Sequence, residues 1–270
     1  MKNIFGIIFL LAISGLMQGC ASDSNALKSC GENCVELGRY PSETDGSPRN
    51  IEWLVIGKEA DGSMVLISKY GLDCLPYHGK RDSVTWETSD IRKWLNTEFL
   101  INAFTKEEQA MIVETALKNE DNAGQFTEAD VEYVKKWKAE EPVIEGLKEL
   151  VNDKEHNHWN TPGGNDTTDK VWLLSISDLE KYGFDTDQSR MVKPLPLVRD
   201  RLGNICGNLY DVCDELNVAD NYAWWLRSPG FMNSTATDVW YDGDIDHDGL
   251  NVENGLVAIR PVIKIKPAKK

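Results

Sequence analysis

Strand-like runs at both ends of the chain, with helical patterns between them, constrain the fold more than any other feature. Residues 51–57 and 64–69 are rich in β-branched and aromatic residues, and Asp61 and Gly62 between them are typical of a hairpin turn. From Tyr222 onward, short strand-like segments alternate with Gly, Asn and Asp. This order predicts an α+β domain whose N-terminal and C-terminal strands pair in one antiparallel sheet, with helices between.

The middle of the chain carries helix start signals. Thr88 or Ser89 can cap a helix whose apolar side chains fall on one face. Thr105 and Glu108 have the spacing of a capping box, which predicts a helix over residues 107–117.

One long segment does not fit the core pattern. Residues 119–165 are charged and polar, and they end in a loop-forming stretch at 160–164. We predict that they form an insertion over the surface of a domain that spans residues 35–270. The polar residues 20–34 before this domain are typical of a tether.

The N-terminus has the features of an export signal. Lys2 supplies a positive charge, and the apolar residues 4–16 are too short to span a bilayer as a stable helix. The segment Leu-Met-Gln-Gly-Cys at 16–20 resembles a bacterial lipobox, in which the cysteine receives diacylglycerol. We therefore predict a lipoprotein signal peptide over residues 1–19 and lipid attachment at Cys20. The alternatives are an ordinary signal peptide cut nearby and a retained anchor helix.

The predicted lipid would hold the protein to a membrane of the bacterial cell envelope. Ala21, which follows Cys20, is not a signal for retention at the inner membrane. We therefore expect the outer membrane or the cell surface.

The formal net charge of −15 limits the partners of the chain. The leader carries Lys2 and no acidic residue, so its removal leaves a net charge of −16. Binding of nucleic acid needs a basic surface, which this composition does not provide. An acidic surface also repels anionic lipids and phosphate groups.

Cysteine spacing agrees with export. Cys30 and Cys34 form one local pair and Cys206 and Cys213 another, and both are disulfide candidates in an oxidising compartment. Cys74 is left over, and we expect a buried thiol rather than a nucleophile. The cysteine and histidine spacings do not match a zinc site.

Two segments of the C-terminal third carry a family resemblance. Residues 224–230 read WWLRSPG, and residues 259–262 read IRPV. Five segments upstream match the sequence pattern of the same family, at 37–41, 51–53, 66–70, 89–96 and 170–175. On these residues the chain resembles a bacterial family of domains of unknown function, of the DUF6273 type, over about residues 35–266. The stretch 119–165 fits this resemblance least well.

The resemblance implies a fold similar to C-type-lectin-like and formylglycine-generating-enzyme-type domains. That scaffold is typical of exported binding domains, and it implies no particular activity. The enzymes of the wider group use a catalytic cysteine pair, which cannot be placed here. The EPN and QPD triplets of calcium-dependent sugar-binding lectins are absent from the sequence.

An aspartate-rich run at 242–249 is the sharpest chemical signal. Asp244, Asp246 and Asp248 alternate like the first half of an EF-hand loop, and their oxygens could bind calcium. The second half of that pattern fails, because Gly255 stands where a bidentate Glu is required. The alternative is a simple hairpin turn, for which Asp and Gly are favourable residues.

Aromatic residues and one arginine are the candidates for ligand binding. Trp224 and Trp225 are adjacent, so on a strand their side chains point to opposite faces, and one of them could face outward. Trp240 and Tyr241 form a second aromatic candidate beside the aspartate run. Arg227 could bind an anion, or it could pair with buried carboxylates or carbonyls. The alternative for the two tryptophans is that both pack within the fold.

No motif of a known catalytic class is present, so no catalytic residue is assigned. The function that fits best is an exported, lipid-anchored module that binds a glycan or a protein at the cell envelope. Two alternatives remain: an enzyme of another kind that uses Cys74, Cys206 or Cys213, and a structural envelope protein.

Overall fold

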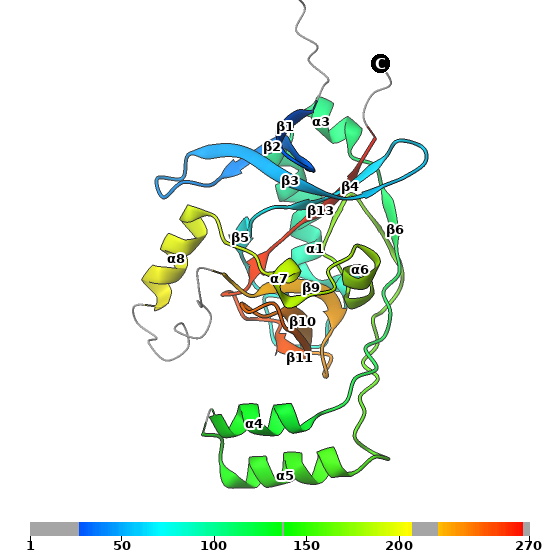
Figure 1. Cartoon of the computed structure of the whole chain (residues 1–270), viewed down its shortest axis with the longest axis vertical. Coiled ribbons are helices and arrows are strands. Elements are labelled where there is room, and N and C mark those ends of the chain that lie inside the picture. The colour runs from blue at the N-terminus through cyan, green and yellow to red at the C-terminus, as the bar shows by residue number, and fades with distance from the viewer. Residues whose placement is uncertain (1–26, 137, 207–220, 267–270) are drawn as a thin grey trace, which may run out of the picture.

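Two β-sheets form the centre of the fold (Figure 1). The computed structural model describes residues 27–136, 138–206 and 221–266. In these ranges the first sheet has six strands in antiparallel pairs. Their order is β1 (Lys28–Gly31), β2 (Cys34–Pro41), β3 (Pro48–Lys58), β4 (Met64–Ser68), β13 (Val262–Ile265) and β8 (Val171–Trp172).

The first sheet joins the two ends of the domain. β3 and β4 form the expected hairpin, and β4 pairs with the C-terminal strand β13, with Val262 opposite Ile67 and Ile265 opposite Met64. The predicted α+β class and the pairing of N-terminal with C-terminal strands are therefore confirmed. Consecutive residues of β4 and β13 are buried, so both faces of the sheet are covered at these strands.

The second sheet carries the late strands of the chain. Its order is β11 (Ile245–Asn251), β10 (Thr235–Val239), β9 (Trp224–Pro229), β12 (Ala258–Ile259) and β5 (Asp73–Cys74). β9 and β12 run parallel, and the other neighbours are antiparallel.

Short helices pack around the two sheets. Those of the first half of the domain are η1 (Trp86–Thr88), α1 (Asp90–Trp94), the π-helical η2 (Leu95–Phe99), α2 (Leu100–Ala103) and α3 (Lys106–Met111). Those of the second half are α6 (Ile176–Lys181), α7 (Asp187–Arg190) and α8 (Pro196–Cys206). In the described ranges, none of the helices combines the length and the hydropathy needed to cross a bilayer.

The helix caps lie where the sequence predicted them, but one helix ends earlier than predicted. The Ser89 hydroxyl accepts a hydrogen bond from Arg92 N–H, and Thr105 and Glu108 form the predicted capping box. The helix predicted over residues 107–117 was too long, because α3 ends at Met111. Val113 N–H then donates to the Lys264 carbonyl at 2.9 Å, so pairing with the C-terminal strand replaces the helix.

Folded structure also begins earlier than we expected. Residues 28–34 belong to the predicted tether, yet they form β1 and the start of β2. Lys28 pairs with Glu36 across these strands, which extends the first sheet by one strand. The described structure therefore overlaps the second half of the predicted tether.

A projecting arm occupies the region of the predicted insertion. β6 (Thr115–Leu117) pairs with β7 (Thr167–Asp169), and the chain between them extends as a ribbon to α4 (Glu128–Lys136) and α5 (Glu141–Asn152) (Figure 1). We call residues 118–166 the arm. Asn122 and Thr161 exchange backbone hydrogen bonds across the ribbon.

A buried ion pair anchors the base of the arm. The Asp169 carboxylate is almost fully buried and accepts hydrogen bonds from Arg92, Trp86 and Thr167 at 2.8–3.0 Å. Arg92 and Trp86 belong to the early helices, so Asp169 ties β7 to the core. Removal of one partner of such a pair leaves an uncompensated buried charge.

We predict that Asp169→Ala lowers the free energy of unfolding by about 3–5 kcal/mol, because Arg92 and Trp86 then lose their buried acceptor. Chemical denaturation of the two proteins measures the difference. Asp166→Ala is the matched control, since Asp166 makes an exposed pair with Lys118 on the same arm. An equal loss in both variants would contradict the assignment.

Candidate functional site

Arg227 of the WWLRSPG segment joins three parts of the chain. Its buried guanidinium donates to the Asp178 carboxylate of α6 and to the Leu173 carbonyl. It also donates to the Lys118 carbonyl and the Asn119 side chain at the start of the arm, at 2.9 and 3.2 Å. These donors serve the protein itself, which agrees with the alternative that Arg227 pairs with buried carboxylates and carbonyls and leaves it unavailable to bind a ligand.

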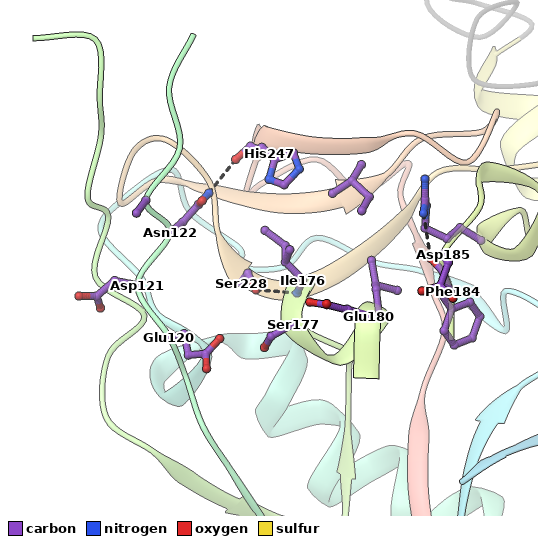
Figure 2. Close-up of a pocket in the computed structure, with 14 residues that line it drawn as sticks. Glu120, Asp121, Asn122, Ile176, Ser177, Glu180, Phe184, Asp185, Ser228 and His247 are labelled. Atoms are coloured by element: carbon purple, nitrogen blue, oxygen red, sulfur yellow. Dashed lines mark hydrogen bonds between the residues drawn. The ribbon is translucent and has the colours of Figure 1, made fainter. Parts of the chain in front are cut away.

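A groove lies where these three parts meet (Figure 2). It has a volume of about 470 Å³ and is open to solvent. We call it the α6 groove. Its walls come from the arm, from α6 and the loop after it, and from β9 and β11: Glu120, Asp121, Asn122, Ala123, Ile176, Ser177, Leu179, Glu180, Phe184, Asp185, Arg190, Ser228, Ile245 and His247.

Hydrogen bonds hold the walls of the groove in place. The buried Asn122 side chain donates to the carbonyls of Pro229 and His247, at 2.9 and 2.8 Å, and so fixes the arm to β9 and β11. The Ser228 hydroxyl accepts from Ile176 N–H at 3.1 Å, which fixes α6 to β9. Figure 2 shows the hydrogen bond from Asn122 to His247 and the one from Ile176 to Ser228.

The groove is acidic. Glu120, Glu180 and Asp185 are exposed, and their carboxylates make no hydrogen bond or ion pair within the described ranges. The one arginine in the wall, Arg190, is buried and donates to the carbonyls of Gly243 and Phe184 and to Asp187. The groove therefore offers free acceptors and no free guanidinium.

The two tryptophans of the WWLRSPG segment are both fully buried, which agrees with the alternative that both pack within the fold and excludes an outward-facing ring. Trp224 donates to the Arg190 carbonyl, and Trp225 donates to the Leu75 carbonyl. Their side chains do point to opposite faces of β9, but both faces are covered by packed chain. Periodicity along a strand cannot reveal whether the second face is covered.

Trp240 and Tyr241 are half-buried at the turn between β10 and β11. Their ring centroids lie 5.8 Å apart. They are outside the set of residues that line the α6 groove. They therefore remain a separate aromatic surface next to it.

The aspartate run forms the turn and strand of a hairpin. Asp244 is exposed, and its carboxylate accepts a hydrogen bond from the adjacent Ile245 N–H. Asp246 and Asp248 lie on β11 and are partly buried. The predicted carboxylate set of Asp244, Asp246 and Asp248 is not found among the described groups of three possible ligands within 4.8 Å of one another.

A different aspartate, Asp238 of β10, joins them. It is opposite Asp246 in the β10–β11 pairing and is fully buried. Burial raises its pKa well above the ordinary value. Burial, and then the neighbouring carboxylates, raise the pKa of Asp246 to about 6 and that of Asp248 to about 8. Sequence reasoning missed Asp238, although an Asp inside an otherwise apolar strand is a recognisable signal.

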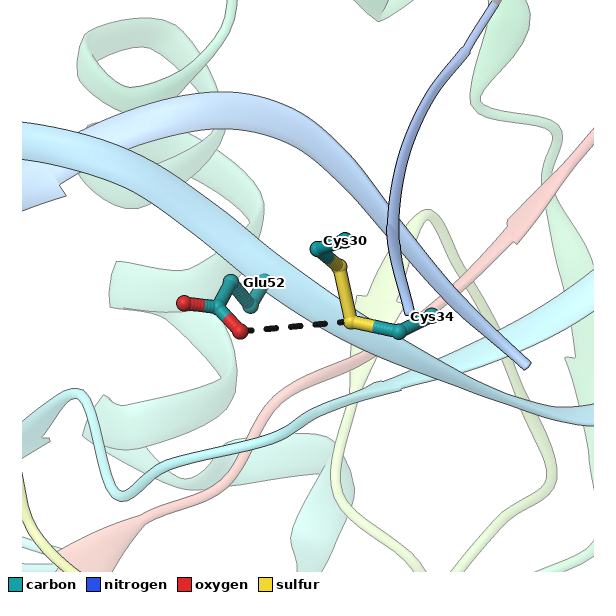
Figure 3. Close-up of side chains that lie close together, drawn as sticks. All are labelled: Cys30, Cys34 and Glu52. Atoms are coloured by element: carbon teal, nitrogen blue, oxygen red, sulfur yellow. Dashed lines mark hydrogen bonds between the residues drawn. A yellow bond between two sulfur atoms is a disulfide. The ribbon is translucent and has the colours of Figure 1, made fainter. Parts of the chain in front are cut away.

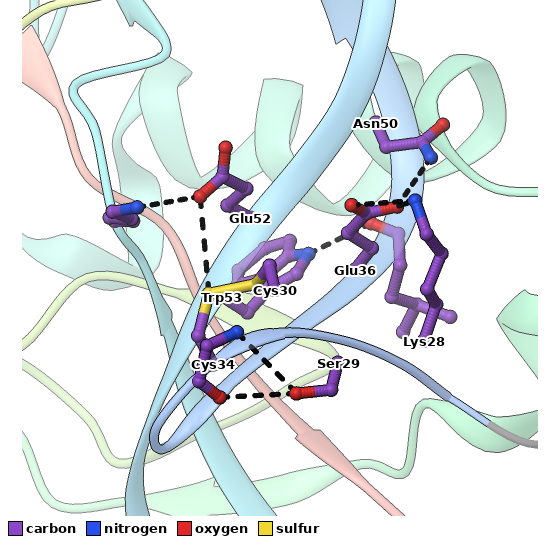
Figure 4. Close-up of a disulfide and its surroundings, with 11 residues drawn as sticks. Lys28, Ser29, Cys30, Cys34, Glu36, Asn50, Glu52 and Trp53 are labelled. Carbon is purple, nitrogen blue, oxygen red and sulfur yellow. Dashed lines mark hydrogen bonds and ion pairs between the residues drawn. A yellow bond between two sulfur atoms is a disulfide. The ribbon is translucent and has the colours of Figure 1, made fainter.

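The predicted Cys30–Cys34 disulfide is confirmed, with the two Cα atoms 5.1 Å apart. Glu52 lies beside the disulfide (Figure 3). The Glu52 carboxylate forms an ion pair with Lys69. In the described part of the chain, these cysteines and Glu52 are the one set of three possible metal ligands within 4.8 Å of one another. The disulfide occupies both sulfur atoms, so this set is structural. Figure 4 shows it closing the β1–β2 turn near Trp53.

Cys74, the one free cysteine among the described side chains, lacks the features of a catalytic thiol. Cys74 is a free, half-buried thiol, and burial followed by the neighbouring Asp73 raises its pKa far above the ordinary value. A nucleophilic cysteine needs the opposite shift. Cys213 lies outside the described residues, as does the side chain of Cys206, so the predicted Cys206–Cys213 disulfide stays a prediction. Cys20 and the predicted signal peptide also lie outside them.

Comparison with known proteins identifies one family. The model described as "Domain of unknown function (DUF6273)" matches residues 61–136 and 140–267. The match includes the arm, apart from residues 137–139. No curated protein and no solved structure matches the chain.

The raised pKa values of Asp246 and Asp248 predict that the domain becomes less stable as the pH rises. Asp246 and Asp248 titrate near 3.8 when unfolded, so their raised pKa values mean that folding takes up protons between about pH 4 and pH 8. Stability from these protons is complete below pH 4 and is lost as the pH rises through 6 and 8. The thermal midpoint in chelator should therefore fall from pH 5 to pH 8.

Asp248→Asn should flatten this fall, because the amide has no proton to lose. Asp244→Asn, in the same hairpin, should keep it. Scanning calorimetry at several pH values gives the comparison. An identical fall in all three proteins would show that the hairpin is not its source.

Proposed function

The chain belongs to the DUF6273 family of domains of unknown function, and we propose that it is an exported, lipid-anchored module that binds a glycan in the α6 groove without catalysis. The observation that carries this proposal is the groove itself. Binding sites for small ligands are concave, with a few convergent polar groups that fix orientation. The α6 groove has this form, and its walls are held by the hydrogen bonds of Asn122, Ser228 and Arg227.

The polar groups of the groove suit sugar hydroxyls. A hydroxyl both donates and accepts hydrogen bonds, and the carboxylates of Glu120 and Glu180 are free acceptors. The Ser177 hydroxyl can also donate. Ile176 adds apolar surface against which the carbon face of a sugar ring can pack.

The negative charge of the groove disfavours glycans that are themselves negatively charged. Its exposed carboxylates repel uronic acids, sialic acids and phosphorylated sugars, and Arg190 is already engaged. A neutral sugar meets no such penalty. An amine-bearing sugar would gain a charge-assisted hydrogen bond. We therefore propose neutral or amino sugars as the ligand class.

We also propose that the domain has a C-type-lectin-like fold, a scaffold typical of exported binding domains. The pairing of β4 with β13 brings the two ends of the domain into one sheet, and a second, smaller sheet carries the WWLRSPG segment on β9. These features agree with that scaffold. The groove would then lie beside the second sheet, on the part of the domain that includes the arm.

A protein ligand is the second candidate, because the arm projects and its Val143 is exposed. An enzyme that uses Cys74 is disfavoured by the raised pKa of that thiol. The binding experiment below separates a glycan from a protein partner.

We predict that the full chain, purified in mild detergent, binds neutral or amino sugars on a glycan array. Glu180→Gln and Glu120→Gln should each weaken the affinity about tenfold, since each removes a charged acceptor from the groove. Glu149→Gln, on the exposed face of α5, is the matched control and should bind as the wild type does.

Two results would contradict this prediction. Binding that is equal in all three variants would place the ligand elsewhere. An empty array, together with a protein captured from envelope extract only when Glu120 and Glu180 are intact, would replace the glycan with a protein ligand.

We also predict that Cys20 carries a lipid. Cells that express the protein and are fed an alkyne-labelled fatty acid should label the wild type. Cys20→Ser should lose the label, because the thioether can no longer form, and Cys74→Ser should keep it. A label that persists in Cys20→Ser would exclude this attachment site.

A further inference from the structure

We propose that Asp238, Asp246 and Asp248 form a binding site for a divalent cation of the calcium type on the β10–β11 hairpin. None of these three residues lines the α6 groove, so the proposed cation site is independent of the proposed glycan site. Three features carry it: an unpaired buried carboxylate, two neighbouring carboxylates beside it, and the lack of a protein cation to balance them.

Asp238 is the central observation. It is fully buried, and neither of its carboxylate oxygens has a hydrogen-bond partner in the described part of the chain. The Leu250 N–H and the Asp246 side chain face it, but neither makes a hydrogen bond to it of normal length. Buried polar groups are nearly always paired, and a buried carboxylate without a donor is strongly unfavourable.

The hairpin brings two more carboxylates to Asp238. Asp246 is directly opposite it on β11, where cross-strand side chains share one face of the sheet. From Asp246 to Leu250, β11 advances four residues while β10 advances two, so Asp248 sits in a bulge. Gly249 makes this bulge feasible: its φ is 73°, and a Cβ there would lie 2.3 Å from the Ala236 carbonyl.

The side chains of Asp246 and Asp248 interact directly. Each carboxylate affects the pKa of the other, so the two charged groups lie close together. Asp246 also accepts a hydrogen bond from Gly249 N–H at 3.2 Å.

None of the described basic residues pairs directly with this cluster. Within the described ranges, no Lys, Arg or His side chain makes a hydrogen bond or ion pair with Asp238, Asp246 or Asp248, and Asp130 of α4 adds a further negative charge near Asp248. Elsewhere the domain pairs its buried carboxylates with arginine, as Asp169 with Arg92 and Asp178 with Arg227. The hairpin cluster therefore requires protons or a cation from solution.

Calcium fits this cluster better than magnesium. Calcium accepts six to eight oxygens in a flexible arrangement, whereas magnesium requires near-ideal octahedral geometry. The three carboxylates do not converge within 4.8 Å of one another in the structure. Binding must therefore rotate Asp246 and Asp248, which are partly exposed, toward the fixed Asp238. A flexible coordination sphere tolerates such an approach.

The test is calorimetric titration of the full chain at pH 8 with calcium chloride and then with magnesium chloride, after removal of metal with chelator. We expect saturable calcium binding and a rise in the thermal midpoint, with at least tenfold weaker magnesium binding. Asp238→Asn should weaken calcium binding at least tenfold. Asp244→Asn, exposed in the same hairpin, should leave it unchanged.

Asp248→Asn provides a second variant if Asp238→Asn does not fold, because its side chain is partly exposed. Loss of calcium binding in Asp248→Asn, with retention in Asp244→Asn, supports the site. The absence of calcium binding to the wild type, or equal weakening in Asp244→Asn and Asp248→Asn, would overturn it. A glycan array with no hits would not affect either result.

Discussion

The rest of the site depends on the buried guanidinium of Arg227. It lies on β9 and binds the end of β8 through Leu173, α6 through Asp178, and the arm through Lys118 and Asn119. An arginine without partners would be very costly to bury, so each of these segments must be in place for the others to be stable. The α6 groove lies between the segments that Arg227 connects, and its shape follows from this interaction.

The acidic residues of the domain lie in three kinds of environment. Many remain on the surface, where they give the chain its net charge of −15 and where the groove presents them to a ligand. Asp169 and Asp178 are buried against arginines. Asp238 is buried without a cationic partner, and the cation site that we propose resolves this exception. The same composition therefore serves solubility, the joining of segments and binding.

Local signals in the sequence predicted the local structure well. Short sequence patterns were sufficient to predict the hairpin at Asp61-Gly62, the helix cap at Ser89 and the capping box at Thr105, because each depends on neighbouring residues. The site depends on contacts between distant residues, such as Asn122 with His247, 125 positions apart. No pattern in one sequence specifies such a contact, or whether both faces of β9 are covered, and for that reason the sequence left two alternatives open for Trp224 and Trp225.

Hydrogen exchange of Arg227→Gln, compared with the wild type, tests most directly whether Arg227 builds the groove. Our account predicts that residues 118–122 and 174–181 lose protection together, while β2, β3 and β4 of the first sheet keep theirs. Unchanged protection in both groove segments would contradict it. Equal loss across the first sheet would also contradict it, because Arg227 would then stabilise the whole domain and not the walls of the groove.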